Sequence, residues 1–67
     1  AKPGETVLLV DDVLATGGAL IAAIKLVQAT GASVTSVGVL IEIAALGGRE
    51  KLQSEFPGLA IHAIYIV

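Results

Sequence analysis

Apolar and polar residues fall in blocks along the chain, and these blocks predict strands separated by helices. The first apolar block, Val7–Val10, follows the turn signal Pro3-Gly4. A continuously apolar run is typical of a strand that is covered on both faces in a parallel sheet. A helix is the competing interpretation of so short a run, but its β-branched valines favour a strand. We therefore expect a first strand over Glu5–Val10.

The second block has the spacing of a helix. After a loop over Asp11–Gly17, a helix is expected to begin at Gly18 and to end near Thr30. Gly31 should then adopt the left-handed conformation that commonly ends a helix. Four residues form the apolar face of this predicted helix: Leu20, Ala23, Ile24 and Val27.

The rest of the chain repeats the order of strand and helix. A second strand is expected over Ser33–Ile43, a short helix over Arg49–Glu55 and a third strand over Leu59–Val67. A strand–helix–strand unit of this length places its two strands parallel in one sheet. The predicted fold class is therefore α/β, with a small, mainly parallel three-stranded sheet (βαβαβ) and two helices. The short last connection leaves the direction of the third strand open.

Composition limits the chain to one small domain. It has 67 residues, of which 55% are hydrophobic and 15% are charged. A domain of this size buries only about 60% of the surface that its unfolded chain exposes. So apolar a chain is expected to be a piece of a larger protein or to bury apolar surface against a partner. Because strand edges also invite pairing, we expect a homodimer or a higher self-assembly.

Several classes of protein are excluded by the same composition. The chain has no cysteine, which excludes disulfides and thiolate chemistry. No apolar run approaches the roughly 20 residues of a membrane-spanning helix. The net charge is −2 and the basic residues are scattered, which argues against binding to nucleic acid. We expect a cytoplasmic protein.

The strongest chemical signal lies between the first strand and the first helix. Asp11 and Asp12 directly follow the apolar strand, and Thr16-Gly17-Gly18 leads into the helix. The unpaired N–H groups of a helix start suit a phosphate, and adjacent acids suit the hydroxyls of a ribose 5-phosphate. Helix capping alone would explain one acid or one threonine, but not two acids and a glycine pair. The pattern matches neither a Walker A loop nor a dinucleotide-binding fingerprint.

The other polar residues are expected to be structural. Glu42 ends the second strand at the same edge as the acids and could face a ligand, but a solvated strand-end acid is the favoured interpretation. His62 is expected to be a partly buried structural histidine, and Tyr65 an amphipathic strand residue. Three neighbouring residues should form the charged face of a short surface helix rather than a phosphate contact: Arg49, Glu50 and Lys51.

The segment Val7–Ala19, VLLVDDVLATGGA, resembles the phosphoribosyl-pyrophosphate binding motif of the type I phosphoribosyltransferases. Leu40–Ile43 and Leu46–Leu52 are similar to the adenine phosphoribosyltransferases in particular, so the resemblance covers nearly the whole chain. It implies that Asp11 and Asp12 hold the ribose 2- and 3-hydroxyls. It also implies that five residues wrap the 5-phosphate: Ala15, Thr16, Gly17, Gly18 and Ala19.

Two departures from that family affect the expected activity. The family usually has threonine where this chain has Ala19, so one hydroxyl donor to the phosphate is lost. A hydrogen bond to a charged group contributes about 1.5–3 kcal/mol, so affinity should fall without vanishing. The chain is also expected to lack the family's purine-binding hood, pyrophosphate loop and flexible catalytic loop. No catalytic residue is assigned, and the chain alone should not turn over.

The resemblance implies a single partial domain over residues 1–67, the phosphoribosyl-binding portion of a purine-salvage glycosyltransferase. The whole enzyme would convert adenine and phosphoribosyl pyrophosphate to AMP and pyrophosphate with Mg²⁺. Ligands of this portion would be phosphoribosyl pyrophosphate, AMP or phosphate. Two alternatives stay open: a minimal phosphate- or nucleotide-binding module, engineered or ancestral in style, and a structural fragment that only self-associates.

Overall fold

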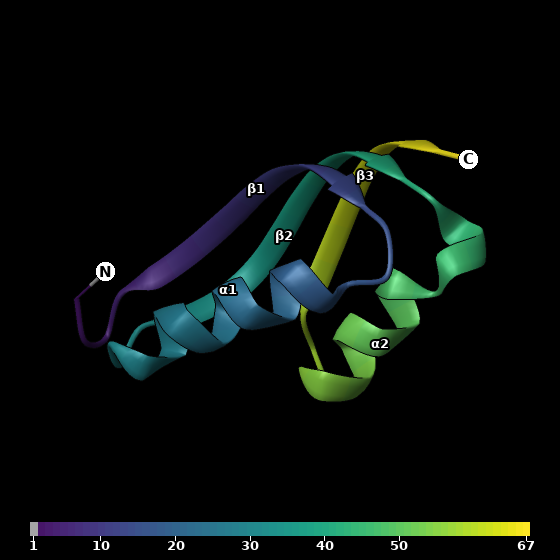
Figure 1. The fold of residues 1–67 in the computed structure, drawn as a ribbon. Helices are drawn as coiled ribbons and strands as arrows, with labels where there is room; N and C mark the ends of the chain where they lie inside the picture. Colours follow the sequence, from purple (N-terminus) through teal and green to yellow (C-terminus); the bar gives the residue numbers. More distant parts are fainter. Residues whose placement is uncertain (1) are drawn as a thin grey trace.

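The computed structural model describes residues 2–67 as one layer of strands and one layer of helices. Figure 1 shows the order of the elements along the chain. They are β1 (Thr6–Leu14), α1 (Gly18–Ala29), β2 (Ser33–Glu42), the 3-10 helix η1 (Ala44–Leu46), α2 (Gly48–Glu55) and β3 (Ala60–Ile66). The predicted α/β class with three strands and two α-helices is confirmed.

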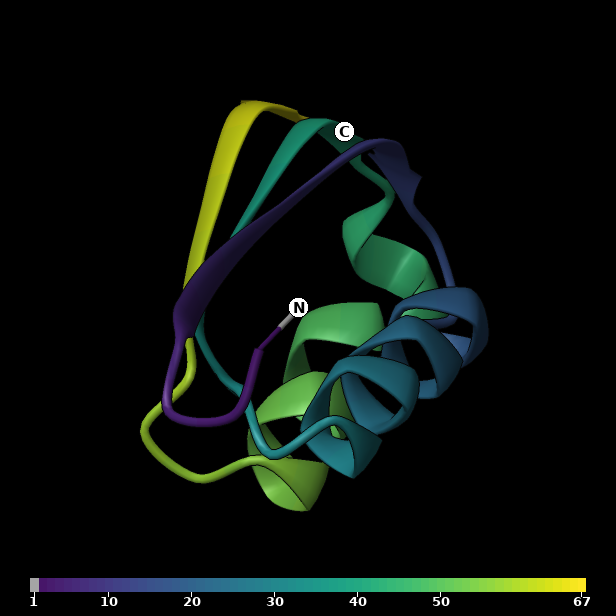
Figure 2. The same ribbon diagram turned by 90° about the vertical axis from the view of Figure 1, so that its left-hand side faces the viewer.

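The sheet has the order β1-β2-β3, and both strand pairs are parallel. Leu9 pairs with Val37, and Val37 pairs with Ile61, so the direction of the third strand is the same as that of the other two. Both helices cover the same face of the sheet (Figures 1 and 2). Crossovers of one hand that step in one direction across a sheet place their helices on one face.

The first strand is longer than the apolar run predicts. Asp11 pairs with Val39 and Leu14 pairs with Glu42, so the predicted loop from Asp11 onward is wrong over its first four residues. The acids fit within β1 because β1 is an edge strand, where exposed polar side chains do not prevent pairing. The helix boundary was predicted well, and Gly31 has the expected left-handed φ of 87°.

The core lies between the sheet and the two helices. Its buried residues come from the three strands, the two α-helices and the segment before β3: Leu14, Leu20, Ile21, Ile24, Val37, Val39, Leu52, Leu59 and Ile61. Leu14, which the sequence placed in a loop, has no exposed surface. Ile21 joins the predicted apolar face of α1, whereas Ala23 and Val27 are only half-buried. The end of β1 therefore anchors the core beneath the β1–α1 junction.

None of the helices in residues 2–67 lies over the other face of the sheet (Figure 2). Leu8 is 60% exposed and Val10 is 76% exposed, so the prediction of a strand covered on both faces is wrong for this structure. Leu40 and Ile64 are exposed on the neighbouring strands, and a shallow apolar hollow runs past Val10, Leu40 and Ile64. None of the described helices is long and apolar enough to span a membrane.

We predict that the chain self-associates through this bare face, because a contiguous apolar patch in water favours association. Val10→Lys puts a charge on the patch and should shift the chain toward monomer, whereas Ala22→Lys on exposed α1 should not. Sedimentation velocity over a range of concentrations measures the effect. A folded parent chain that stays monomeric at the highest concentration would contradict the prediction.

Candidate functional site

The junction of β1 and α1 forms a small hollow of about 80 Å³. It is lined by residues from the end of the strand and the start of the helix: Asp11, Val13, Leu14, Ala15, Thr16, Gly17, Ala19 and Leu20. Five of the seven predicted site residues therefore lie around one hollow. Asp12 and Gly18 lie beside them in the chain but do not line it.

The start of α1 leaves backbone donors free at this hollow. Gly17 occupies the N-cap position with φ 89°, and no side chain caps the helix. The Gly18 N–H reaches only the Thr16 Oγ1, at 3.5 Å, and the N–H groups of Ala19 and Leu20 have no protein acceptor within residues 2–67. Free N–H groups and the positive end of the helix dipole together favour an anion here.

The two acids are exposed and are oriented by their own backbone. The Asp12 N–H donates to Asp11 Oδ1 at 2.8 Å, and the Val13 N–H donates to Asp12 Oδ1 at 2.9 Å. Within the described part of the chain, the second oxygen of each carboxylate has no hydrogen-bond donor. Each acid can therefore accept a hydrogen bond from a ligand hydroxyl while its side chain is held in place.

These acids do not form a metal site. Among residues 2–67, no group of three or more His, Cys, Asp or Glu side chains is placed to hold a metal ion. Mg²⁺ needs several oxygen ligands in octahedral geometry and is often bound through one or two carboxylates together with substrate phosphates. Asp11 and Asp12 alone supply too few oxygen ligands for a magnesium site made only by the described residues.

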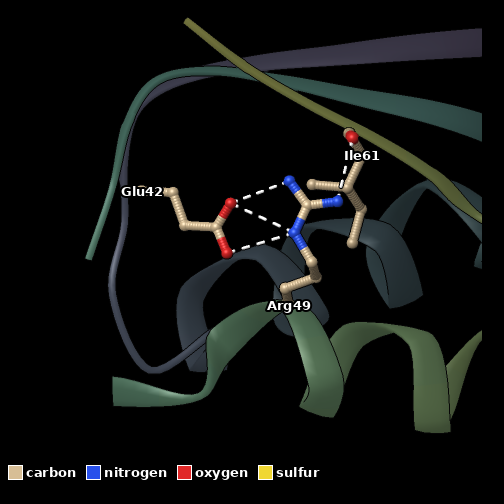
Figure 3. Close-up of polar contacts among 3 residues, drawn as sticks. All are labelled: Glu42, Arg49 and Ile61. Carbon is tan, nitrogen blue, oxygen red and sulfur yellow. Dashed lines mark hydrogen bonds and ion pairs between the residues drawn. The ribbon is translucent and has the colours of Figure 1, made fainter. Parts of the chain in front are cut away.

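Glu42 and Arg49 form an ion pair beneath the carboxyl edge of the sheet (Figure 3). Arg49 Nη2 donates to Glu42 Oε1 at 2.7 Å, Arg49 Nε lies 3.1 Å from both carboxylate oxygens, and Arg49 Nη1 donates to the Ile61 carbonyl at 3.1 Å. The hydrogen bonds to Glu42 raise the pKa of Arg49 above its ordinary value, although partial burial opposes the shift. The pair thus links β2, α2 and β3.

This ion pair corrects two sequence predictions. Glu42 is not a solvated strand-end acid, since it is only 4% exposed, and Arg49 is not part of a solvated face. The sequence did contain a signal for this ion pair, because Glu42 and Arg49 carry opposite charges at the two ends of the short segment between β2 and α2. Glu50 and Lys51 are exposed as predicted, whereas His62 is exposed rather than partly buried. Tyr65 is exposed near the end of β3.

A second glycine pair, Gly47-Gly48, lies beside the β1–α1 loop; the sequence placed it in the segment Leu46–Leu52 that resembles the family but did not predict its contact with that loop. Gly48 is the buried first residue of α2, and a β-carbon on it would overlap the Ala15 carbonyl oxygen. A β-carbon on Gly17 would lie 3.0 Å from the Gly48 carbonyl oxygen. The backbones of the loop and of α2 therefore touch without intervening side chains.

Fold and site together describe a parallel α/β protein whose first strand–helix junction has free backbone N–H groups beside two acids within residues 2–67. A family model described as uracil phosphoribosyltransferase matches residues 2–66. The chain therefore belongs to the phosphoribosyltransferase family that this model describes.

Individual relatives are adenine phosphoribosyltransferases, as the resemblance of residues 7–52 indicated. The chain is 44% identical over 63 residues to the enzyme of Marinobacter nauticus, covering 94% of this chain and 34% of that protein. It is 63% identical over 49 residues to that of Rhodococcus jostii, covering 73% and 28%. The chain thus spans about a third of the length of these curated relatives.

Solved structures of the same family share the fold. The adenine phosphoribosyltransferase of Thermoanaerobacter pseudethanolicus matches with a TM-score of 0.90 and 39% identity, covering 100% of this chain and 38% of that one. The enzyme of Trypanosoma brucei, in complex with AMP, pyrophosphate and ribose-5-phosphate, matches with a TM-score of 0.82 and 28% identity, covering 98% and 30%.

We predict that Glu42→Gln destabilises the chain by about 2 kcal/mol, because it leaves the Arg49 guanidinium partly buried without its charged partner. Arg49→Lys should also destabilise the chain, since a single ammonium group cannot reproduce the hydrogen bonds of the guanidinium to both Glu42 and the Ile61 carbonyl. Glu55→Gln, an exposed acid at the end of the same helix, is the control and should change stability by less than about 0.5 kcal/mol. Urea unfolding followed by circular dichroism measures all three, and equal stability of the Glu42 and Glu55 variants would contradict the assigned role.

Proposed function

We propose that the chain is the phosphoribosyl-binding portion of an adenine phosphoribosyltransferase. The observation that carries the proposal is the set of free backbone N–H groups at the start of α1, where Ala19 and Leu20 line a hollow that Asp11 also lines. The match to an adenine phosphoribosyltransferase that binds ribose-5-phosphate, over 98% of this chain, supports the same assignment.

The 5-phosphate would bind at the loop of residues 15–19, which we call the phosphate loop. Its lining residues include no lysine or arginine, so the attraction comes from N–H groups and the helix dipole. The Thr16 hydroxyl lies 3.5 Å from the Gly18 N–H, too long for a strong hydrogen bond, so it is free to turn toward a phosphate oxygen. Ala19 offers only its backbone N–H.

The ribose would bind at the carboxylates. Asp11 and Asp12 would accept hydrogen bonds from the 2- and 3-hydroxyls through the carboxylate oxygens that no donor among residues 2–67 uses. Their negative charges repel inorganic phosphate and ribose 5-phosphate alike. Only the ribose offers hydroxyl donors, whose hydrogen bonds to the carboxylates offset this repulsion. The site would therefore prefer a sugar phosphate to inorganic phosphate.

For the whole protein we propose transfer of phosphoribose from phosphoribosyl pyrophosphate to adenine, which gives AMP and pyrophosphate. This chain's share is to anchor and orient the phosphoribosyl group, and positioning of this kind can contribute several kcal/mol to catalysis. We assign adenine and pyrophosphate binding to none of its residues. Mg²⁺, if the whole protein uses it, would take most of its oxygen ligands from the substrate and water, since the described residues contain no group of three or more metal-ligating side chains.

We predict opposite effects of Asp11→Asn on two ligands. Ribose 5-phosphate should bind about tenfold more weakly, because a charge-assisted hydrogen bond to the sugar is lost. Inorganic phosphate should bind slightly more tightly, because a repelling charge is gone. Asp12→Asn should behave alike, whereas Glu5→Gln, the same change before β1, should alter neither. Calorimetric titration gives the affinity of the parent and of each variant for both ligands; an equal loss for both ligands would show that the acids only maintain structure.

We also predict that Ala19→Thr tightens the binding of both ligands by about tenfold, because it restores a hydroxyl donor to the phosphate. Ala22→Thr is the matched control: it carries the same helix-propensity cost on α1 but lies one turn away from the hollow. The same titration serves for both variants. Unchanged affinity in Ala19→Thr would argue against a phosphate at the first turn of α1.

A further inference from the structure

Gly48 lies against the phosphate loop without lining the hollow, and nothing in the proposed chemistry uses it. We propose that Gly48 is a positioning residue, which fixes the shape of the phosphate loop through a direct contact between backbones. This inference rests on the proposed function, because the shape of the loop affects binding only if the loop binds a phosphate. The contact between the backbones is present in the fold whether or not a ligand binds.

The contact leaves no room for a side chain on either glycine. A β-carbon on Gly48 would overlap the carbonyl oxygen of Ala15 and would lie 2.8 Å from Leu14 Cδ1. From the other side, a β-carbon on Gly17 would lie 3.0 Å from the Gly48 carbonyl oxygen. The loop therefore lies against Gly48 at Ala15 and at Gly17, just before the free N–H donors of α1.

The first turn of α2 is itself held firmly against the sheet. Arg49, the next residue, is hydrogen-bonded to the Glu42 side chain on β2 and to the Ile61 carbonyl on β3. Leu52, one turn further on, is fully buried in the core. The contacts of Arg49 and Leu52 thus fix the position of Gly48 relative to the sheet. We infer that the phosphate loop takes its shape from packing against Gly48.

The neighbouring glycine makes no such contact, which provides a matched control. A β-carbon on Gly47 would meet only the Glu50 carboxylate, at 3.9 Å. Gly47 has a φ of 71°, so alanine there is strained, whereas alanine at Gly48 suits the helix. Backbone preference alone predicts that Gly47→Ala destabilises the fold more than Gly48→Ala. If the loop contact matters, Gly48→Ala should nevertheless weaken ligand binding more than Gly47→Ala.

The experiment compares Gly48→Ala with Gly47→Ala by titrating ribose 5-phosphate into each folded variant. We expect binding about tenfold weaker for Gly48→Ala and nearly unchanged for Gly47→Ala, since displaced donors lose charge-assisted hydrogen bonds. In the ligand-free proteins, the amide resonances of residues 15–19 should shift in Gly48→Ala only. Parental affinity in Gly48→Ala, or equal losses in both variants, would overturn the proposal.

Two further outcomes are distinguishable. If the parent chain does not bind ribose 5-phosphate, the proposed function fails, and the ligand-free amide resonances alone decide whether Gly48 positions the loop. If Gly48→Ala does not fold, Glu42→Gln decides, because it loosens the anchor of α2 without adding an atom to the loop. Weaker binding by folded Glu42→Gln than by Glu55→Gln supports positioning by α2, and equal binding overturns it.

Discussion

The ion pair between Glu42 and Arg49 is the constraint on which the carboxyl edge of the sheet depends. A carboxylate that is only 4% exposed must be paired, and here one guanidinium pairs it and also binds a carbonyl of the third strand. The backbone adds to this link, since the Ile43 N–H donates to the Leu14 carbonyl and the Val67 N–H donates to the Glu42 carbonyl. The ends of all three strands are thus joined at the start of α2.

Rigidity at this edge matters because the proposed ligand site is made mostly of backbone. A site without basic side chains attracts a phosphate only if its N–H groups are held in the right directions before the ligand arrives. Contact between Gly17 and Gly48 transmits the position of α2 to those N–H groups. In the proposed function, the carboxylates next to them would turn a general anion site into one suited to a phosphate that carries hydroxyls.

The sequence predicts the local parts of this arrangement and misses those that depend on distant contacts. The β1–α1 junction was found because apolar strand, acids, glycines and helix follow one another directly. The burial of Glu42 was missed because its partner lies seven residues away on another element. The extension of β1 to Leu14 was missed because pairing with β2, rather than residue type, keeps the acids in the strand. A contact between two glycines leaves no side-chain pattern to read.

One measurement addresses the central claim most directly: titration of the ¹⁵N-labelled chain with ribose 5-phosphate, followed through its backbone amide resonances. The account predicts saturable shifts concentrated in Thr16–Leu20, with smaller shifts at Asp11 and Asp12. It would be contradicted if these resonances did not move at millimolar ligand. It would also be contradicted if the shifts were centred on the hollow at the opposite end of the sheet, beside Gln28 and Phe56.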